Sequence, residues 1–333
     1  MAQITFIALE GCFFSGISNL IDAFWIANAW HGALCATAER PLFETRIVTA
    51  DGRPVRAVGN VQVQPDGAMA AADNADVIVI PACSSLPQRT APGIDAILEW
   101  LVVQHERNIT LAAACTGTFM LAEAGLLDGR PATTNWQFAR QFQRRYPKVH
   151  LHMDRILTEA DGILCAGATS AVMHLGLHLI RRFGSDDLAA VCAKAFLVDP
   201  NRSSQAPYAI FRPRKNHGDE EILRAQQWME AHYGSNVAID EVARQVGISP
   251  RHFKRRFRKA TGEAPLGYLQ NVRIEAAKQK LENTQENVNE ITYRIGYEDS
   301  STFRRLFKKH TGISPREYRD KFCGLKAQSF HNP

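Results

Sequence analysis

The chain has 333 residues, more than one ordinary hydrophobic core accommodates, so two domains are expected. Its formal net charge is +5, and the whole excess lies in the last third: residues 219–333 hold 20 Lys and Arg against 15 Asp and Glu, whereas residues 1–218 hold 19 of each. This distribution excludes a uniformly basic protein and predicts that only the second part contacts a polyanion.

Cysteine and histidine usage argues against disulfides and metal. The seven cysteines are odd in number, scattered and without CxxC spacing, as in proteins of a reducing cytosol. The pairs His150/His152 and His174/His178 lack a third ligand at suitable spacing. No export signal is visible, and no apolar run approaches about 18 residues. We therefore expect a cytoplasmic protein with no membrane partner, no metal and no cofactor.

The first 200 residues alternate strand and helix patterns. Apolar strands joined by helices predict an α/β fold with a parallel sheet covered by helices on both faces. The expected strands are Ile4–Leu9, Phe43–Thr49, Asp76–Pro81, Ile109–Ala114, Val149–Leu157 and Ile163–Ala166, and the expected helices are Ile21–Trp30, Ile94–Gln104 and Ala171–Phe183.

Cys115 stands where a strand pattern gives way to a helix pattern among small residues, Ala112 to Thr118. This is the geometry of an elbow that lifts a nucleophile over the C-terminal edge of a sheet. A thiol at a helix N-terminus would have a lowered pKa because of the helix dipole. The alternative is an inert core cysteine.

This elbow, together with Ala124–Arg130, Ala132–Trp136 and Ala166–Ser170, resembles the class I glutamine-amidotransferase-like fold in its intracellular-protease branch. The resemblance places the catalytic histidine of such enzymes on Asn135 and an acidic residue of this branch on Gly16. Asn cannot serve as the base that a cysteine hydrolase needs. The resemblance therefore implies a catalytically degenerate domain, not an enzyme, in which Cys115 is a vestigial nucleophile.

The loops that follow the strands are expected to form a pocket for a small-molecule effector. An aromatic wall with few charges suits an amphiphilic or cationic ligand, although these aromatics could equally serve only for packing. Family resemblance suggests an amine or amino-acid metabolite. The expected ligand-binding residues are Phe13, Phe14, Cys83, Ser84, Cys115, Thr116, Asn135 and Trp136.

Residues 201–218 are rich in Pro, Ser, Asn and Arg, as linkers are, and their aromatic part Tyr208–Phe211 can dock on one of the domains. They are expected to join a sensor and dimerisation domain, 1–200, to a DNA-binding domain, 219–325.

The last hundred residues contain one pattern twice, about fifty residues apart. An apolar helix, a Gly turn and a basic helix make a helix-turn-helix unit, and two in tandem predict an all-α DNA-binding domain. The corresponding pairs are Gly247/Gly296, Phe257/Phe307, Thr261/Thr311 and Tyr268/Tyr318. A long helix from Pro265 to Glu282 separates the units, with Leu266, Leu269, Val272, Ala276 and Leu281 as expected packing residues.

The basic helix of each unit is the expected recognition helix. In the first, Ser249 is the expected N-cap, Phe253 and Phe257 face the core, and six of the nine residues Arg251–Lys259 are basic. In the second, Asp299 or Ser300 is the expected cap. The expected DNA-binding residues are Arg251, Lys254, Arg255, Arg258, Ser300, Ser301, Thr302, Arg304, Arg305 and, toward phosphate, Lys308.

The Gly turns, the Phe pairs and the TGxxPxxY ends, Thr261–Tyr268 and Thr311–Tyr318, resemble the AraC/XylS family of transcription regulators. The order of the two domains and the junction Gln205–Tyr208 resemble the GlxA-like regulators within it. The resemblance implies a sequence-specific activator or repressor that binds double-stranded operator DNA, with RNA polymerase as a further partner and a homodimer formed through the first domain. Two alternatives stay open: a cysteine-dependent hydrolase or lyase fused to a DNA-binding domain, and an architectural DNA binder without a ligand.

Overall fold

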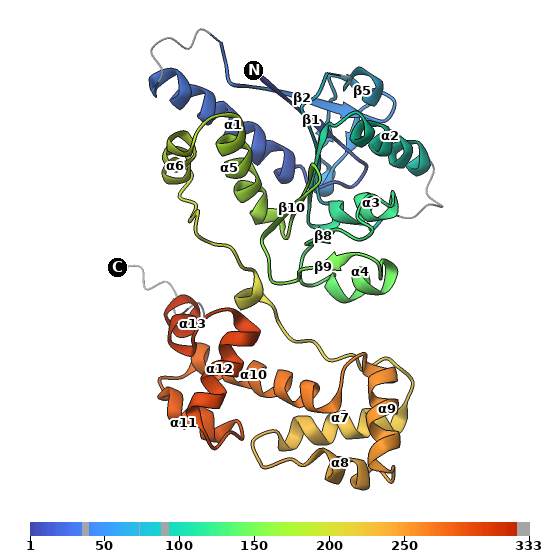
Figure 1. The fold of residues 1–333 in the computed structure, drawn as a ribbon, viewed down its shortest axis with the longest axis vertical. Helices are drawn as coiled ribbons and strands as arrows, with labels where there is room; N and C mark the ends of the chain where they lie inside the picture. Colours follow the sequence, from blue (N-terminus) through green and yellow to red (C-terminus); the bar gives the residue numbers. More distant parts are fainter. Residues whose placement is uncertain (35–39, 73, 88–92, 325–333) are drawn as a thin grey trace. The chain divides into compact units, whose positions relative to one another are not determined.

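The computed structural model describes residues 1–34, 40–72, 74–87 and 93–324, and the chain forms two compact units, Met1–Gln205 and Ala206 onward (Figure 1). Residue 325, the expected end of the second domain, lies outside the described residues. No helix in the described part of the chain is both long and apolar enough to cross a bilayer.

The first unit is built on a sheet that, within the described residues, has seven strands in the order β10-β11-β7-β6-β1-β2-β5. Neighbouring strands run parallel apart from the antiparallel hairpin β10–β11. The bounds are β1 Ala2–Ile7, β2 Phe43–Thr49, β5 Gly67–Ala68, β6 Val77–Ile80, β7 Thr110–Ala114, β10 Leu157–Ala160 and β11 Ile163–Ala166. The predicted α/β fold with a mainly parallel sheet is confirmed.

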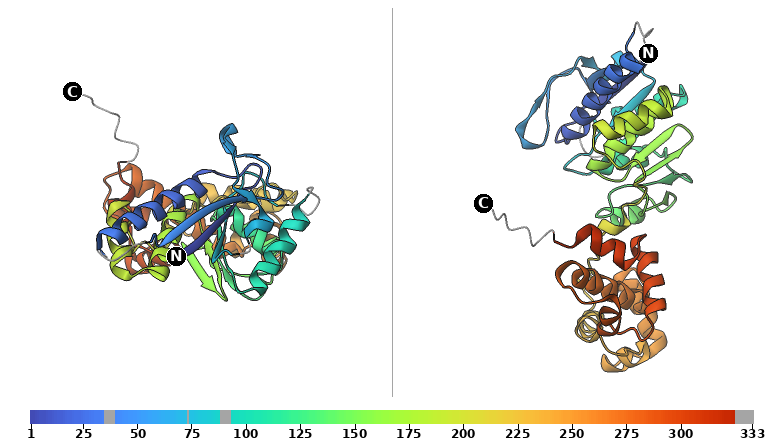
Figure 2. Two further views of the ribbon diagram at one scale, coloured as in Figure 1. Left: turned by 90° about the horizontal axis from the view of Figure 1, so that it is seen from above. Right: turned by 90° about the vertical axis from the view of Figure 1, so that its left-hand side faces the viewer.

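Each face of this sheet has its own hydrophobic cluster, because alternate residues of a strand point to opposite sides. In β6, Val77 and Val79 join one cluster while Ile78 and Ile80 join the other. The first cluster lies under α1 (Ser15–Leu34), α5 (Val172–Phe183) and α6 (Asp186–Ala195), and α1 runs beside α5 in both views of Figure 2. The second lies under α2 (Ile94–Glu106), α3 (Thr118–Glu123) and α4 (Ala139–Arg145).

Short elements connect these layers. They are β3 Val55–Arg56, η1 Val58–Asn60, β4 Gln62–Val63, η2 Met69–Ala72, η3 Cys115–Gly117, β8 Pro131–Ala132, β9 His150–Leu151 and η4 Thr169–Ala171.

Two expectations for this unit need correction. The predicted strand Val149–Leu157 is wrong: only His150–Leu151 and Leu157 are in strands, because the Arg155 N–H donates to the His152 carbonyl and closes a turn between them. Helix α6 was not predicted. Its signal is present, since Ser185 caps it by accepting a hydrogen bond from the Leu188 N–H at 3.1 Å, with two aspartates in the first turn.

The second unit is all α-helical and contains the two predicted helix-turn-helix units, so this prediction is also confirmed. The helices are α7 Glu220–His232, α8 Ile239–Gln245, α9 Pro250–Thr261, α10 Pro265–Asn283, α11 Val288–Arg294, α12 Ser300–Thr311 and α13 Pro315–Phe322. Each helix-turn-helix has a separate core, one around Phe253 and Phe257 and one around Phe303 and Phe307. Helix α10 contributes to both.

The repeated TGxxPxxY sequence has the same structural purpose in both copies. Gly262 and Gly312 end α9 and α12 in the left-handed conformation, with φ of 87° and 77°, which glycine adopts without a Cβ clash. The tyrosines Tyr268 and Tyr318 are buried and donate their hydroxyls to Glu230 and Glu282. The repeat in sequence is therefore a repeat of helix ending and core packing.

Two details of the expected helices differ. Leu266 does not pack but is 55% exposed, because it lies in the first turn of α10, whose buried stripe instead contains Tyr268, Ile274 and Ala277. Ser249 occupies the N-cap position of α9 without a side-chain cap hydrogen bond, whereas Asp299 does cap α12.

The connecting segment begins with η5 (Ala206–Tyr208) and packs on the second unit. The Tyr208 ring meets Phe322 at 5.3 Å between centroids, and Phe211 meets Tyr268 at 5.5 Å. The Lys278 ammonium donates to the Ala209 carbonyl. These residues are therefore ordered by contacts, despite a composition typical of a linker.

Gln205, the last residue of the first unit, is held there through its side chain, which is 3% exposed. Its Nε2 donates to the carbonyls of Thr134 at 2.8 Å and Arg155 at 3.0 Å, and its Oε1 accepts from the Trp136 N–H at 3.3 Å. The exit of the chain from the first unit is thereby tied to residues 134–136.

We predict that Gln205→Ala lowers the free energy of unfolding of the first unit by about 1–3 kcal/mol, because buried carbonyls lose their donor. Calorimetry of the full chain should show the transition of the first unit shifted and that of the second unchanged. Ser203→Ala, an exposed position on the same segment, is the matched control and should shift neither. An equal effect of both variants would contradict the prediction.

Candidate nucleic-acid interface and ligand pocket

Cys115 adopts the strained backbone conformation of an elbow. Its φ is +55°, in the left-handed region, directly after β7. Two residues later, a Cβ on Gly117 would lie 2.6 Å from the Ile80 carbonyl oxygen and 2.7 Å from that of Pro81, so only glycine lets the end of β6 approach so closely. The predicted strand–elbow–helix geometry is present, with η3 (Cys115–Gly117) as the first turn before α3.

Hydrogen bonds bring three of the expected pocket residues together at this edge. The Thr116 hydroxyl donates to the Cys83 carbonyl and accepts from the Cys83 N–H, both at 2.7 Å. Cys83 in turn forms an antiparallel bridge with Cys12. The hydroxyl of Thr134 donates to the Cys115 carbonyl at 2.7 Å. Thr116 and Thr134 thus hold the loops in place with their own hydroxyls.

The expected low pKa of the Cys115 thiol is wrong. Burial raises the pKa, and the hydrogen bonds from the Thr116 N–H, the Thr169 hydroxyl and the Asn135 N–H, which lower it, do not compensate. The residue is only 6% exposed, and the helix that begins here opens with a 3₁₀ turn and is six residues long, so its dipole contributes little. Burial together with neighbouring cysteines also raises the pKa of Cys83, to about 12.

Asn135 contacts the Cys115 thiol through its backbone and not through its side chain. Its N–H faces the sulfur, while its Oδ1 accepts from the Gln137 N–H at 2.9 Å. The groups that act on Cys115 from outside the elbow, Thr169 and Asn135, are not bases.

The remaining expected pocket residues are less enclosed. Phe13 and Trp136 are half-buried, Ser84 is exposed, and Phe14 packs against the hydrophobic cluster of α1 and α5. The sequence identifies Gln205 only as part of a junction, yet its Oε1 accepts a hydrogen bond from the Trp136 N–H. A polar residue next to a chain exit carries no local pattern that would reveal such a contact.

His174 and His178, which lie on one helix, have separate contacts. His178 pairs with Glu159 at 2.9 Å, and the His174 Nε2 lies 3.1 Å from the Asp199 carbonyl oxygen. Among the described residues, no three His, Cys, Asp or Glu side chains are grouped so as to hold a metal ion.

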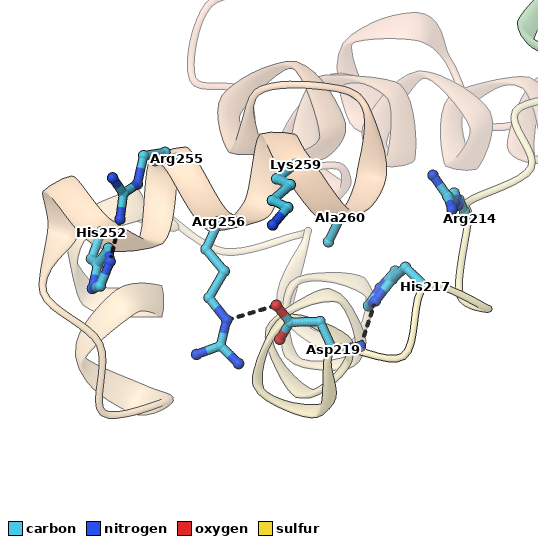
Figure 3. A pocket seen from close by; sticks show the side chains of 8 residues that line it. All are labelled: Arg214, His217, Asp219, His252, Arg255, Arg256, Lys259 and Ala260. Atoms are coloured by element: carbon cyan, nitrogen blue, oxygen red, sulfur yellow. Dashed lines mark hydrogen bonds and ion pairs between the residues drawn. The ribbon is translucent and has the colours of Figure 1, made fainter. Parts of the chain in front are cut away.

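Helix α9 turns a basic face away from its core. Phe253 and Phe257 are fully buried, and the four expected DNA-binding residues are all exposed: Arg251, Lys254, Arg255 and Arg258. Lys254 contacts Asp240 at 2.9 Å, and the Arg255 guanidinium lies 2.6 Å from the His252 Nε2 (Figure 3). Arg251 and Arg258 form no ion pair within the described part of the chain.

Arg256, on the same helix, has a different environment. Its guanidinium pairs with Asp219 at 2.6 Å (Figure 3). It also pairs with Glu221, so it joins α9 to the start of α7. Burial raises the pKa of Asp219, but the hydrogen bonds from Arg256 and the Ile222 N–H, together with the positive charge of Arg256, outweigh it, so the pKa lies below its ordinary value. Arg256 thus positions α9 against α7.

Helix α12 presents a less charged face. Asp299 accepts hydrogen bonds from the N–H groups of Ser301 at 3.1 Å and Thr302 at 2.8 Å, which places the hydroxyl residues in the first turn. Arg304 and Arg305 follow one turn later, both exposed, with Arg304 donating to Asn289 at 3.2 Å. Ser300 and Thr302 are half-buried, and Ser301 and Lys308 are exposed. The two recognition helices therefore differ in chemistry.

Comparison with known proteins agrees with this organisation. Residues 242–321 match the model of a helix-turn-helix domain, and residues 33–182 match the DJ-1/PfpI family. The chain is 26% identical over 315 residues to the HTH-type transcriptional regulator CdhR of Pseudomonas aeruginosa, covering 94% of this chain and 90% of that protein. It is 28% identical over 215 residues to the regulator GlxA of Rhizobium meliloti, covering 62% and 64%.

A crystal structure of an AraC family transcriptional regulator from Pseudomonas putida has a similar fold, with a TM-score of 0.50 and 21% identity over 59% of this chain and all of that chain. The chain thus combines a domain with a cysteine elbow, followed by a repeated helix-turn-helix core with an exposed basic helix. It is an AraC-type helix-turn-helix transcription regulator whose first domain is of the DJ-1/PfpI family.

Proposed function

We propose that this regulator binds a specific operator sequence through α9 and α12, under the control of a small molecule held by a non-catalytic first domain. The observation that carries the proposal is the basic face of α9, which lies opposite two fully buried phenylalanines and recurs in altered form on α12. We assign residues 1–200 to the sensor, 201–218 to the connection and 219–325 to DNA binding.

Base contacts are assigned to the exposed faces of the two recognition helices. Arginine can bond O6 and N7 of guanine together, whereas serine and threonine accept more than one base. Two helices in adjacent major-groove segments address sites about 34 Å apart, one turn of DNA. The proposed base-contacting residues are Arg251, Lys254, Arg255, Arg258, Ser300, Ser301, Thr302, Arg304 and Arg305, with Lys308 on a phosphate.

The effector pocket is assigned to the loops around Cys115. A buried thiol with a raised pKa, and with no base beside it among the residues that the structure describes, is poorly suited to nucleophilic catalysis at neutral pH. The half-buried rings of Phe13 and Trp136 favour an amphiphilic or cationic compound, such as an amine or amino-acid metabolite. Phe14, Cys83, Ser84, Thr116 and Asn135 complete the proposed pocket.

A second candidate is a cysteine-dependent hydrolase or lyase. The left-handed φ of Cys115 favours it, because the strained elbow of a nucleophile persists here. Turnover of a simple amide or aldehyde by the full chain, abolished in Cys115→Ala, would establish this activity in place of a purely binding domain.

The proposed assembly is a homodimer formed through the first domain, with RNA polymerase as a further partner at the promoter. A dimer doubles the length of DNA that one tandem unit can contact. Light scattering of the full chain at micromolar concentration that gives only the mass of a monomer would contradict it.

We predict that Arg255→Ala weakens binding to the preferred duplex by about 1–3 kcal/mol, as expected for one good base contact. The duplex is first selected from a random pool with the wild-type chain, and affinities for it and for a scrambled duplex are measured by fluorescence anisotropy. Arg224→Ala, at an exposed position of α7 outside the recognition helices, is the control and should leave both affinities unchanged.

Lys308→Ala tests the opposite case to Arg255→Ala, because Lys308 is assigned to a phosphate and a phosphate contact carries no sequence information. It should weaken binding to the preferred and the scrambled duplex alike. If Arg255→Ala behaved in this way too, Arg255 would be a phosphate contact and not a base contact.

We further predict that alkylation of Cys115 by iodoacetamide is slow at neutral pH and becomes faster as the pH rises beyond 9.0, the ordinary thiol value, because only the thiolate reacts and burial raises the pKa. Peptide mass spectrometry over a pH series measures the rate at this site. A rate that reaches its plateau below pH 7 would indicate an activated thiol and favour the enzymatic alternative.

A further inference from the structure

We propose that α9 also binds the DNA backbone along a second flank, and that the connecting segment takes part through Arg214. This inference rests on the proposed function, since it assigns a phosphate-binding surface beside the base-contacting face. We call this surface the phosphate flank and define it by Arg214, His252 and Lys259.

These side chains line one open cavity of about 710 Å³ between α9 and the segment that leads into α7 (Figure 3). His252 and Lys259 lie two turns apart on one side of α9, and Arg214 closes the cavity from the connecting segment. Arg255, between them, borders this cavity and also the surface of Lys254 and Arg258, so it joins the flank to the base-contacting face. Arg251, Lys254 and Arg258, on the base-contacting face, do not line it.

The positive charge of this flank is not cancelled internally. The only carboxylate among the lining residues is Asp219, and it is already paired with Arg256 at 2.6 Å and caps α7 by accepting from the Ile222 N–H. Arg256 is also paired with Glu221. Arg214 and Lys259 have no ion-pair partner in the described part of the chain, so both cations are available to an anion.

Arg214 is held in position, although it belongs to a segment of linker composition. Its carbonyl accepts a hydrogen bond from Gln226 Nε2 at 3.0 Å, and Gln226 is fully buried in α7. The other amide atom of Gln226 accepts from His217 Nε2 at 2.9 Å, because His217 Nδ1 already accepts from the Asp219 N–H. This network connects the backbone at Arg214 to α7, the helix that Arg256 joins to α9.

The dimensions favour a chain of phosphates over one free phosphate. From His252 to Lys259 the flank follows about 10 Å of helix at ~1.5 Å per residue, which is longer than a single phosphate group. The flank also adjoins the recognition face, where backbone contacts set the register of a helix in the major groove. A free phosphorylated compound would offer the same phosphate chemistry, so the experiment must distinguish its binding from DNA binding.

The test uses the full chain and measures affinity for a random-sequence duplex and for the selected duplex over a series of salt concentrations. Each phosphate contact contributes about 0.9 to the slope of log affinity against log salt. Arg214→Ala should reduce that slope by about 0.9 on both duplexes and leave their affinity ratio unchanged. Arg214→Lys, which keeps the charge, should retain the slope, and thermal unfolding verifies that the variants are folded.

Lys215→Ala is the matched control. Lys215 is the adjacent cation, but its ammonium is paired with Glu230 at 2.6 Å, so its removal should leave the slope unchanged. Lys259→Ala should behave as Arg214→Ala does.

Three results would overturn the inference. One is wild-type DNA binding with a slope that Arg214→Ala does not alter. Another is stoichiometric binding of inorganic pyrophosphate that requires Arg214 while DNA affinity does not, which would assign the flank to a free phosphorylated ligand. The third is a wild-type chain that binds no duplex, which would remove the proposed function as well, whereas the first two leave it standing.

Discussion

Burial of two phenylalanines four residues apart orients each recognition helix. Phe253 and Phe257 in α9, and Phe303 and Phe307 in α12, are fully buried in separate cores. Since a helix turns by about 100° per residue, burying one stripe determines which side chains face outward. Removal of large aromatic side chains from such a core costs about 3–5 kcal/mol, much more than any exposed charge contributes. The outward basic surface of α9 is therefore a consequence of its packing.

A second constraint acts on α9 through charge. Arg256 joins α9 to Asp219 and Glu221 at the start of α7, so these two carboxylates are already paired and do not neutralise Arg214 or Lys259. Of the six Arg and Lys residues on the helix, Arg256 and Lys254 form ion pairs with carboxylates of the protein, whereas Arg251, Arg258 and Lys259 form none within the described part of the chain. Similar residues in one short stretch consequently have unlike roles, determined by the carboxylates that the fold brings near each.

Cys115 has the backbone geometry of a nucleophile elbow, but its thiol lacks the lowered pKa of a reactive cysteine. The left-handed φ of Cys115 and the close approach of Gly117 to β6 are required by the way the strand turns into a helix. The thiol itself is buried among hydroxyls and backbone groups, and desolvation outweighs the hydrogen bonds that favour the thiolate. From this edge, Thr134 and Gln205 extend a chain of hydrogen bonds to the point where the polypeptide leaves the unit.

The sequence by itself determined the α/β class of the first unit, the tandem helix-turn-helix repeat and the exposed basic face, because strand and helix periodicity and the spacing of Phe, Gly and Pro are local properties. It also located the elbow at Cys115. Only the tertiary structure decided the direction of the Cys115 pKa, the contacts of Gln205, the pairing of Arg256 and the place of Arg214 beside α9. Each depends on groups brought together from distant parts of the chain, and desolvation and charge pairing arise only when those groups meet.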